Sequence, residues 1–149
     1  MASVQVSIAV KNDISAILFL MNGKLIQKDV QKVRNYCNGN NTFTNLLSTI
    51  YDAMLKTRYF IEENPQIDTV VFEINNSTIQ SWFDRCYAKT EYNDLFLKIE
   101  LVLQSIPIKY DIIVSQKPKA LMFADKKYVK AEKVSSLDSF IQELDAQIS

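Results

Sequence analysis

The sequence predicts one α/β domain (1–149) whose mixed five-stranded sheet has helices on both faces. Three observations lead to this prediction. Residues 4–30 show the apolar alternation and turns of an antiparallel meander, two later apolar runs have the length of buried strands, and segments with helical periodicity separate them. With 149 residues, of which 48% are hydrophobic, the chain has the size and composition of one compact domain.

The N-terminal segment predicts three antiparallel strands. Val4–Val10 alternates at period two, and Ile14–Met21 is largely apolar. The Asn22-Gly23 pair that follows is typical of a type I′ hairpin turn. Lys24–Val30 then returns as a more polar strand, which we expect at an edge of the sheet.

Helices are expected on either side of a buried fourth strand. Thr42 or Thr44 can cap a helix that ends at Asn64-Pro65. Residues 69–74 read as a strand covered on both faces, and Asn76 or Ser77 can cap the short helix after it.

The C-terminal third predicts a long helix, a fifth strand and a final helix. The long helix carries its apolar residues over 95–106, and residues 110–114 read as another covered strand. Residues 120–133 are ambiguous, and 137–148 carry the stripe of an amphipathic helix. The strands are expected to contribute five residues to the core: Val10, Ile17, Val71, Ile74 and Ile113.

The composition excludes several kinds of chemistry. The chain has no histidine, which removes Ser-His-Asp and Cys-His catalysis and most zinc sites. Two glycines are too few for a Gly-rich phosphate loop, and Cys37 and Cys86 make no disulfide framework. Because the sequence shows neither a signal-peptide pattern nor an apolar run of membrane-spanning length, we expect a cytoplasmic protein without membrane contact.

Three motifs resemble the ribonuclease H family in their order and spacing. Asn40–Leu46 is similar to the family's entry to its first helix, where a catalytic Glu precedes a Leu. Asn75–Trp82 is similar to the Asp-Ser stretch that ends the fourth strand, and Ala124-Asp125 to the Ala-Asp pair that holds the last metal-binding Asp. The resemblance implies a ribonuclease H-like fold, whose active members cut the RNA of a hybrid through two magnesium ions held by four acidic residues.

Three of those four acidic positions lack a carboxylate here. Asn45 stands where the helix Glu is expected and Asn75 where the fourth-strand Asp is expected, so that Asp125 alone matches. The candidate positions for the first-strand Asp are Ser7, Ala9 and Val10. Because magnesium requires hard anionic ligands, we expect no cofactor and a non-catalytic protein that acts by binding. The Asn-, Lys- and Ile-rich composition suits a viral or mobile-element accessory protein.

Two alternatives remain open. Glu73 shares a strand face with Asn75, and Asp13, Glu73 and Asp125 could form a rearranged magnesium site of a nuclease. Against this, an acidic residue in an apolar strand usually has a polar partner. The second alternative is an assembly protein that forms homo-oligomers through the exposed edge of its third strand.

The charges suggest what the protein binds. The net charge is zero, from 17 basic and 17 acidic residues, so no long-range attraction to nucleic acid is expected. Lysines nevertheless gather after the fifth strand, near the expected site, where they could contact phosphates weakly and without sequence preference: Lys117, Lys119, Lys126, Lys127 and Lys130. A solvated lysine surface with a protein partner elsewhere is the simpler alternative. Trp82 and Phe83 are expected in the core and not as base-stacking residues.

Overall fold

The computed structural model describes residues 2–37, 39, 41–85 and 90–125. Its elements follow the predicted order: β1 (Ala2–Lys11), β2 (Ile14–Met21), β3 (Lys24–Lys32), α1 (Thr42–Glu63), β4 (Ile67–Ile74), α2 (Ser77–Arg85), the 3₁₀ helix η1 (Thr90–Tyr92), α3 (Asn93–Ser105), β5 (Lys109–Val114) and α4 (Leu121–Ala124). The helix expected over 137–148 lies outside the described residues.

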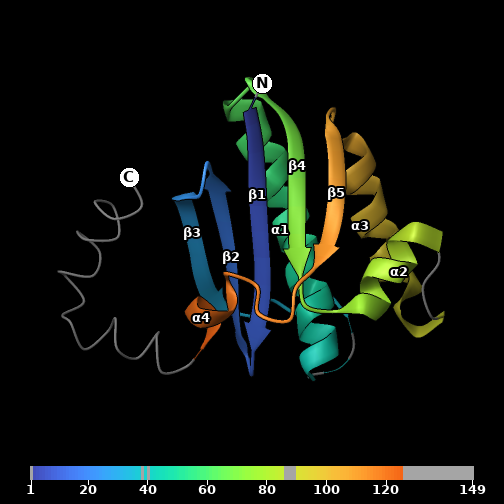
Figure 1. Ribbon diagram of the computed structural model, residues 1–149. Coiled ribbons are helices and arrows are strands. Elements are labelled where there is room, and N and C mark those ends of the chain that lie inside the picture. The colour runs from blue at the N-terminus through green and yellow to red at the C-terminus, as the bar shows by residue number, and fades with distance from the viewer. Residues whose placement is uncertain (1, 38, 40, 86–89, 126–149) are drawn as a thin grey trace.

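The strands form one five-stranded sheet, in which they lie in the order β3-β2-β1-β4-β5 (Figure 1). β1 pairs antiparallel with β2 and parallel with β4, and β5 extends the parallel part. The type I′ turn between β2 and β3 is confirmed, because Asn22 and Gly23 have φ angles of 53° and 76°. β3 is an edge strand, as its polar sequence predicted.

The two faces of the sheet are covered unequally. The main core lies between the sheet and helices α1 and α3, and includes Phe19, Phe72 and Phe96, each fully buried. On the other face, the four-residue α4 and its N-cap residue pack over β1 and β2, where Ala120 and Ala124 are buried (Figure 1). Within the described residues, no helix is long and apolar enough to cross a membrane.

β5 differs from its prediction as a covered strand. It is the second edge of the sheet, and Ile112 is buried while Ile113 is 38% exposed, so Ile113 is not a core residue. Ile17 and Ile74 are buried as predicted, whereas Val10 and Val71 are half-buried. An apolar run fits a central strand and an edge strand alike, which is why the sequence alone misplaced β5.

The N-terminus of α1 is capped by Asn41 and not by Thr42 or Thr44. Asn41 Oδ1 accepts the backbone N–H of Thr44 at 2.9 Å, and the hydroxyl of Thr44 accepts the backbone N–H of Asn41 at 3.1 Å. This reciprocal pair is a capping box, which satisfies two backbone donors. Asn76 caps α2 as expected, by accepting the backbone N–H of Ile79.

Replacing Asn41 tests the importance of this cap. We expect Asn41→Ala to lower the free energy of unfolding by about 1 kcal/mol, because the N–H of Thr44 loses its acceptor. Asn41→Asp keeps the acceptor and places a negative charge at the helix N-terminus, so it should retain wild-type stability. Urea unfolding of the three proteins measures the difference. Equal loss in both variants would show that the amide, and not the acceptor oxygen, matters.

Candidate functional site

The positions of the family motif meet at one end of the sheet. Asn75, just after β4, lines a pocket of about 50 Å³ with Ala9 and Val10 at the end of β1. Asn45, in the first turn of α1, lines a second pocket of about 380 Å³, together with Asp13 of the β1–β2 turn. The two pockets share Thr42.

Asp125 reaches the same end of the sheet and forms an ion pair there. Its Oδ2 lies 3.0 Å from Nζ of Lys11, the last residue of β1. Both side chains are partly exposed, so solvent screens the pair and its contribution to stability is small. The structure thus brings Asp125 to the end of the sheet where Asn45 and Asn75 lie, and places a lysine beside it.

Asn45 makes a hydrogen bond that a carboxylate could not. The residue is 3% exposed, and its Nδ2 donates to the backbone carbonyl of Asn12 at 3.0 Å. A glutamate or aspartate here would direct an anionic oxygen at that carbonyl. Asn45 Oδ1 is buried and has no hydrogen-bond partner in the described part of the chain. The amide therefore ties α1 to the β1–β2 turn.

Glu73 acts as a structural clip. It is 6% exposed, and its Oε1 accepts the hydroxyl of Ser7 at 2.7 Å and the backbone N–H of Lys119 at 3.0 Å. Ser7 Oγ in turn accepts the backbone N–H of Ala120 at 2.8 Å. These contacts hold the loop after β5 against β1 and β4, and they give the buried carboxylate the partners that burial requires.

The rearranged acidic site does not assemble among these residues. The contacts of Glu73 are with Ser7 and Lys119, and Asp125 faces Lys11. Across the described ranges, no three His, Cys, Asp or Glu side chains lie close enough to hold a metal ion together.

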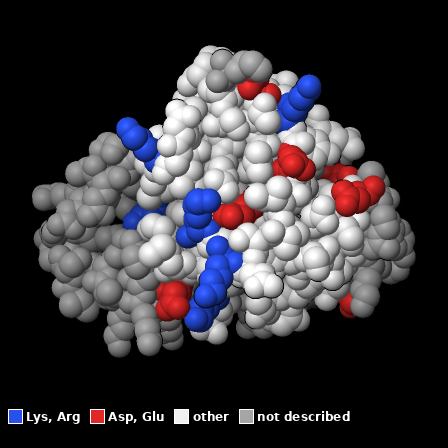
Figure 2. All heavy atoms as spheres, in the orientation of Figure 1, with Lys and Arg blue, Asp and Glu red and all other residues white. Residues whose placement is uncertain are grey.

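Basic residues lie on the same face of the molecule as α4. Lys117 and Lys119 are exposed on the loop after β5, and Nζ of Lys119 donates to Gln5 Oε1 at 3.3 Å. Figure 2 shows Lys and Arg side chains near the middle of this face, with acidic side chains mainly toward the right. The other three lysines of the predicted patch lie outside the described residues: Lys126, Lys127 and Lys130.

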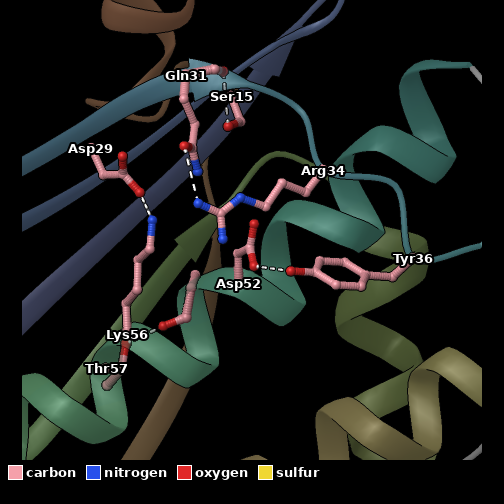
Figure 3. A network of polar contacts seen from close by, with 9 residues as sticks. Ser15, Asp29, Gln31, Arg34, Tyr36, Asp52, Lys56 and Thr57 are labelled. Carbon is pink, nitrogen blue, oxygen red and sulfur yellow. Dashed lines mark hydrogen bonds and ion pairs between the residues drawn. The ribbon is translucent and has the colours of Figure 1, made fainter.

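A polar network between β3 and α1 was missed by the sequence analysis (Figure 3). Lys56 forms an ion pair with Asp29, and burial lowers the pKa of this lysine. The hydroxyl of Tyr36 donates to Asp52 Oδ1 at 2.6 Å, and burial followed by this bond raises the pKa of Tyr36. The network joins the edge strand to α1 through residues far apart in the sequence, so no local sequence pattern predicts it.

The aromatic residues of α2 are part of the core, as expected. Trp82 is 3% exposed and its ring lies 5.5 Å from that of Phe43 and 6.0 Å from those of Tyr92 and Phe96. Phe83 is half-buried and packs on Phe96 at 5.0 Å. Neither ring is an open stacking platform for bases.

No protein-family model and no curated protein matches the sequence. Solved structures do. The RNase H1 named LC11, crystallised with an RNA/DNA hybrid, matches with a TM-score of 0.62 at 11% identity, over 91% of this chain and 100% of that one. The fold is that of ribonuclease H. RNase H1 from Halobacterium salinarum has a TM-score of 0.54 at 9% identity, over 87% of this chain and 98% of that one.

A further match is the N-terminal RNase H domain of a Mycobacterium tuberculosis protein. Its TM-score is 0.58 at 6% identity, and the match covers 91% of this chain and 99% of that chain. At such identities the ribonuclease H fold is shared while the side chains of the site can differ entirely, so function must be argued from the site itself.

The Glu73 clip can be tested by unfolding. We expect Glu73→Ala to lower the free energy of unfolding by about 1 to 3 kcal/mol, because Ser7 and the N–H of Lys119 lose a buried acceptor. The double variant Glu73→Ala/Ser7→Ala should lose less stability than the two single variants lose together, because both single changes remove the same hydrogen bond. A double-mutant cycle measured by urea unfolding detects this difference.

A metal-binding role for Glu73 would give a different result. Manganese would then raise the melting temperature of the wild type and not of Glu73→Gln. A clip without metal predicts melting temperatures that manganese leaves unchanged in both proteins.

Proposed function

We propose that this ribonuclease H-like protein acts by binding and does not hydrolyse nucleic acid. The observation that carries the proposal is Asn45, a buried amide that donates to the Asn12 carbonyl at the position where the family motif has a catalytic acid. Asn75 provides a second amide at the same end of the sheet. An amide preserves size and hydrogen bonding, but it lacks the negative charge that holds a dication.

Magnesium does not fit the side chains at this end of the sheet. Two-metal hydrolysis needs several carboxylates around ions about 4 Å apart. Asp125 is the one acidic residue of the motif, and the ammonium of Lys11 lies 3.0 Å from it, where it opposes a further cation. Glu73 is committed to Ser7 and the loop after β5. We therefore derive no metal-dependent step for this chain.

Hydrolysis can be tested directly. Purified protein should leave a labelled RNA–DNA hybrid intact in magnesium or manganese, because too few carboxylates are present to bind two ions. The control is Asp125→Asn prepared in the same way, which reveals any contaminating nuclease. Metal-dependent cleavage by the wild type that disappears in Asp125→Asn would overturn the proposal.

Weak phosphate binding is the form of binding that the exposed lysines favour. Lys117 and Lys119 lie on the loop after β5, and the bond from its backbone N–H to Glu73 holds Lys119 in place before any partner arrives. Contacts to phosphates alone give weak binding that depends on salt and little on sequence. With a net charge of zero, the protein adds no long-range attraction.

The lysines can be tested on single-stranded DNA. We expect Lys117→Ala/Lys119→Ala to weaken binding at about 50 mM salt and to reduce the slope of log K against log salt by about 1 to 2, since two phosphate contacts are lost. Fluorescence anisotropy measures both quantities.

The matched control removes two exposed charges elsewhere. Arg58 of α1 and Lys98 of α3 are both exposed on the helical side, so Arg58→Ala/Lys98→Ala should bind as the wild type does. Equal loss in both double variants would show general charge attraction without a site. If the wild type does not bind single-stranded DNA, the proposal of phosphate binding is wrong and a protein partner takes its place.

A further inference from the structure

Within the described residues, β5 is an edge strand whose outer side pairs with no other strand. The backbone N–H of Ser115 donates to Ile74 O at 2.9 Å, and Asp111 and Ile113 are registered opposite Val71 and Glu73. Because alternate residues of a parallel strand bond to the same neighbour, odd-numbered residues of β5 bond to β4. The backbone groups of Tyr110 and Ile112 therefore point to the outside of the sheet.

Exposed apolar residues gather at this edge. Three of the six residues of β5 are apolar and exposed: Tyr110, Ile113 and Val114 are 47%, 38% and 43% exposed. Three of the nine exposed large apolar residues in the described part of the chain thus lie on this one short strand. Such a concentration is typical of a protein-binding surface.

We propose that a second copy of this chain pairs antiparallel with β5, about a twofold axis that passes through Tyr110. In this register Tyr110 faces Tyr110 of the other copy as a hydrogen-bonded pair, and the outward backbone groups of Ile112 face Ile108 of the other copy. The two sheets then form one continuous sheet.

Charge complementarity selects a second copy and this register. Lys109 and Asp111 are both exposed and lie on one face of β5, two residues apart. About the Tyr110 axis, each Lys109 stands opposite the other copy's Asp111 in a non-hydrogen-bonded pair, where side chains approach closely. Centring the axis on Asp111 would instead oppose two like charges.

Asp111 protects the edge in the single chain. Its Oδ1 accepts the outward N–H of its neighbour Ile112 at 2.9 Å. A local bond of this kind occupies a donor that another strand would use. When the strands pair, the N–H of Ile112 donates instead to the carbonyl of Ile108 of the second copy. The carboxylate of Asp111 is then free to face Lys109 of that copy.

The opposite edge is less suited to pairing with itself. β3 carries Lys24, Lys28 and Lys32, so an antiparallel arrangement about Lys28 would place Lys28 against itself and Lys24 against Lys32. The ladder between β2 and β3 also has an irregularity at Phe19/Leu20, a feature that blunts strand edges.

A charge swap tests the proposal on the full-length chain. Sedimentation equilibrium should find the wild type in a monomer–dimer equilibrium. Asp111→Lys should weaken the dimer at least tenfold, because two lysines then face each other on each side of the axis. Lys109→Asp/Asp111→Lys restores the opposite charges and should restore the dimer. A wild type that stays monomeric, or an Asp111→Lys variant that dimerises as well as the wild type, would overturn the proposal.

Cysteine cross-linking tests the register independently. Paired Cα atoms on the axis lie about 5.5 Å apart, a distance that suits a disulfide. Tyr110→Cys should therefore form a covalent dimer on mild oxidation. Val114→Cys is a matched control, since Val114 is similarly exposed and lies on the same face of β5 but away from the axis. Equal cross-linking of Tyr110→Cys and Val114→Cys would contradict the register.

Discussion

The parallel pairing of β1 with β4 is the constraint on which the arrangement of the molecule depends. β1 lies between β2 and β4, and the crossover from β3 to β4 must run back across the sheet, which α1 does (Figure 1). Neighbouring parallel strands have their C-terminal ends at the same end of the sheet, so the C-terminal ends of β1 and β4 lie together there. α1 begins at that end, and the bond from Asn45 to the Asn12 carbonyl fixes its position.

Polar side chains at this end serve to hold elements together. Asn45 links α1 to the first hairpin, and Glu73 with Ser7 holds the loop that leads to α4. Each is buried, and a buried polar group costs free energy unless a partner satisfies it. In a catalytic ribonuclease H the corresponding end must instead keep carboxylates available for metal ions. In this chain the amide of Asn45 and the carboxylate of Glu73 have hydrogen-bond partners within the protein, which is the basis of the proposal that it acts by binding.

The two edges of the sheet are treated differently. β3 is charged along its length and is joined to α1 by the ion pair of Asp29 with Lys56, and the segment after β3 is joined to α1 by the bond of Tyr36 to Asp52. β5 is short, and its exposed apolar side chains stand beside the opposite charges of Lys109 and Asp111. Since a strand edge carries unpaired backbone groups, this difference is the reason for proposing that a second copy pairs with β5 and not with β3.

The sequence by itself determined the features that depend on neighbours a few positions apart. Asn22-Gly23 specified its hairpin turn, Asn64-Pro65 the end of α1, and the apolar runs the order of strands and helices. The resemblance in the sequence also picked out Asn45 and Asn75, which the structure places at the same end of the sheet. Only the tertiary structure decided that Asn45 donates to Asn12, that Glu73 pairs with Ser7, and that β5 is an exposed edge. Those facts depend on which distant segments pack together. An apolar run or a lone acidic residue is compatible with several such arrangements, so the local sequence does not distinguish between them.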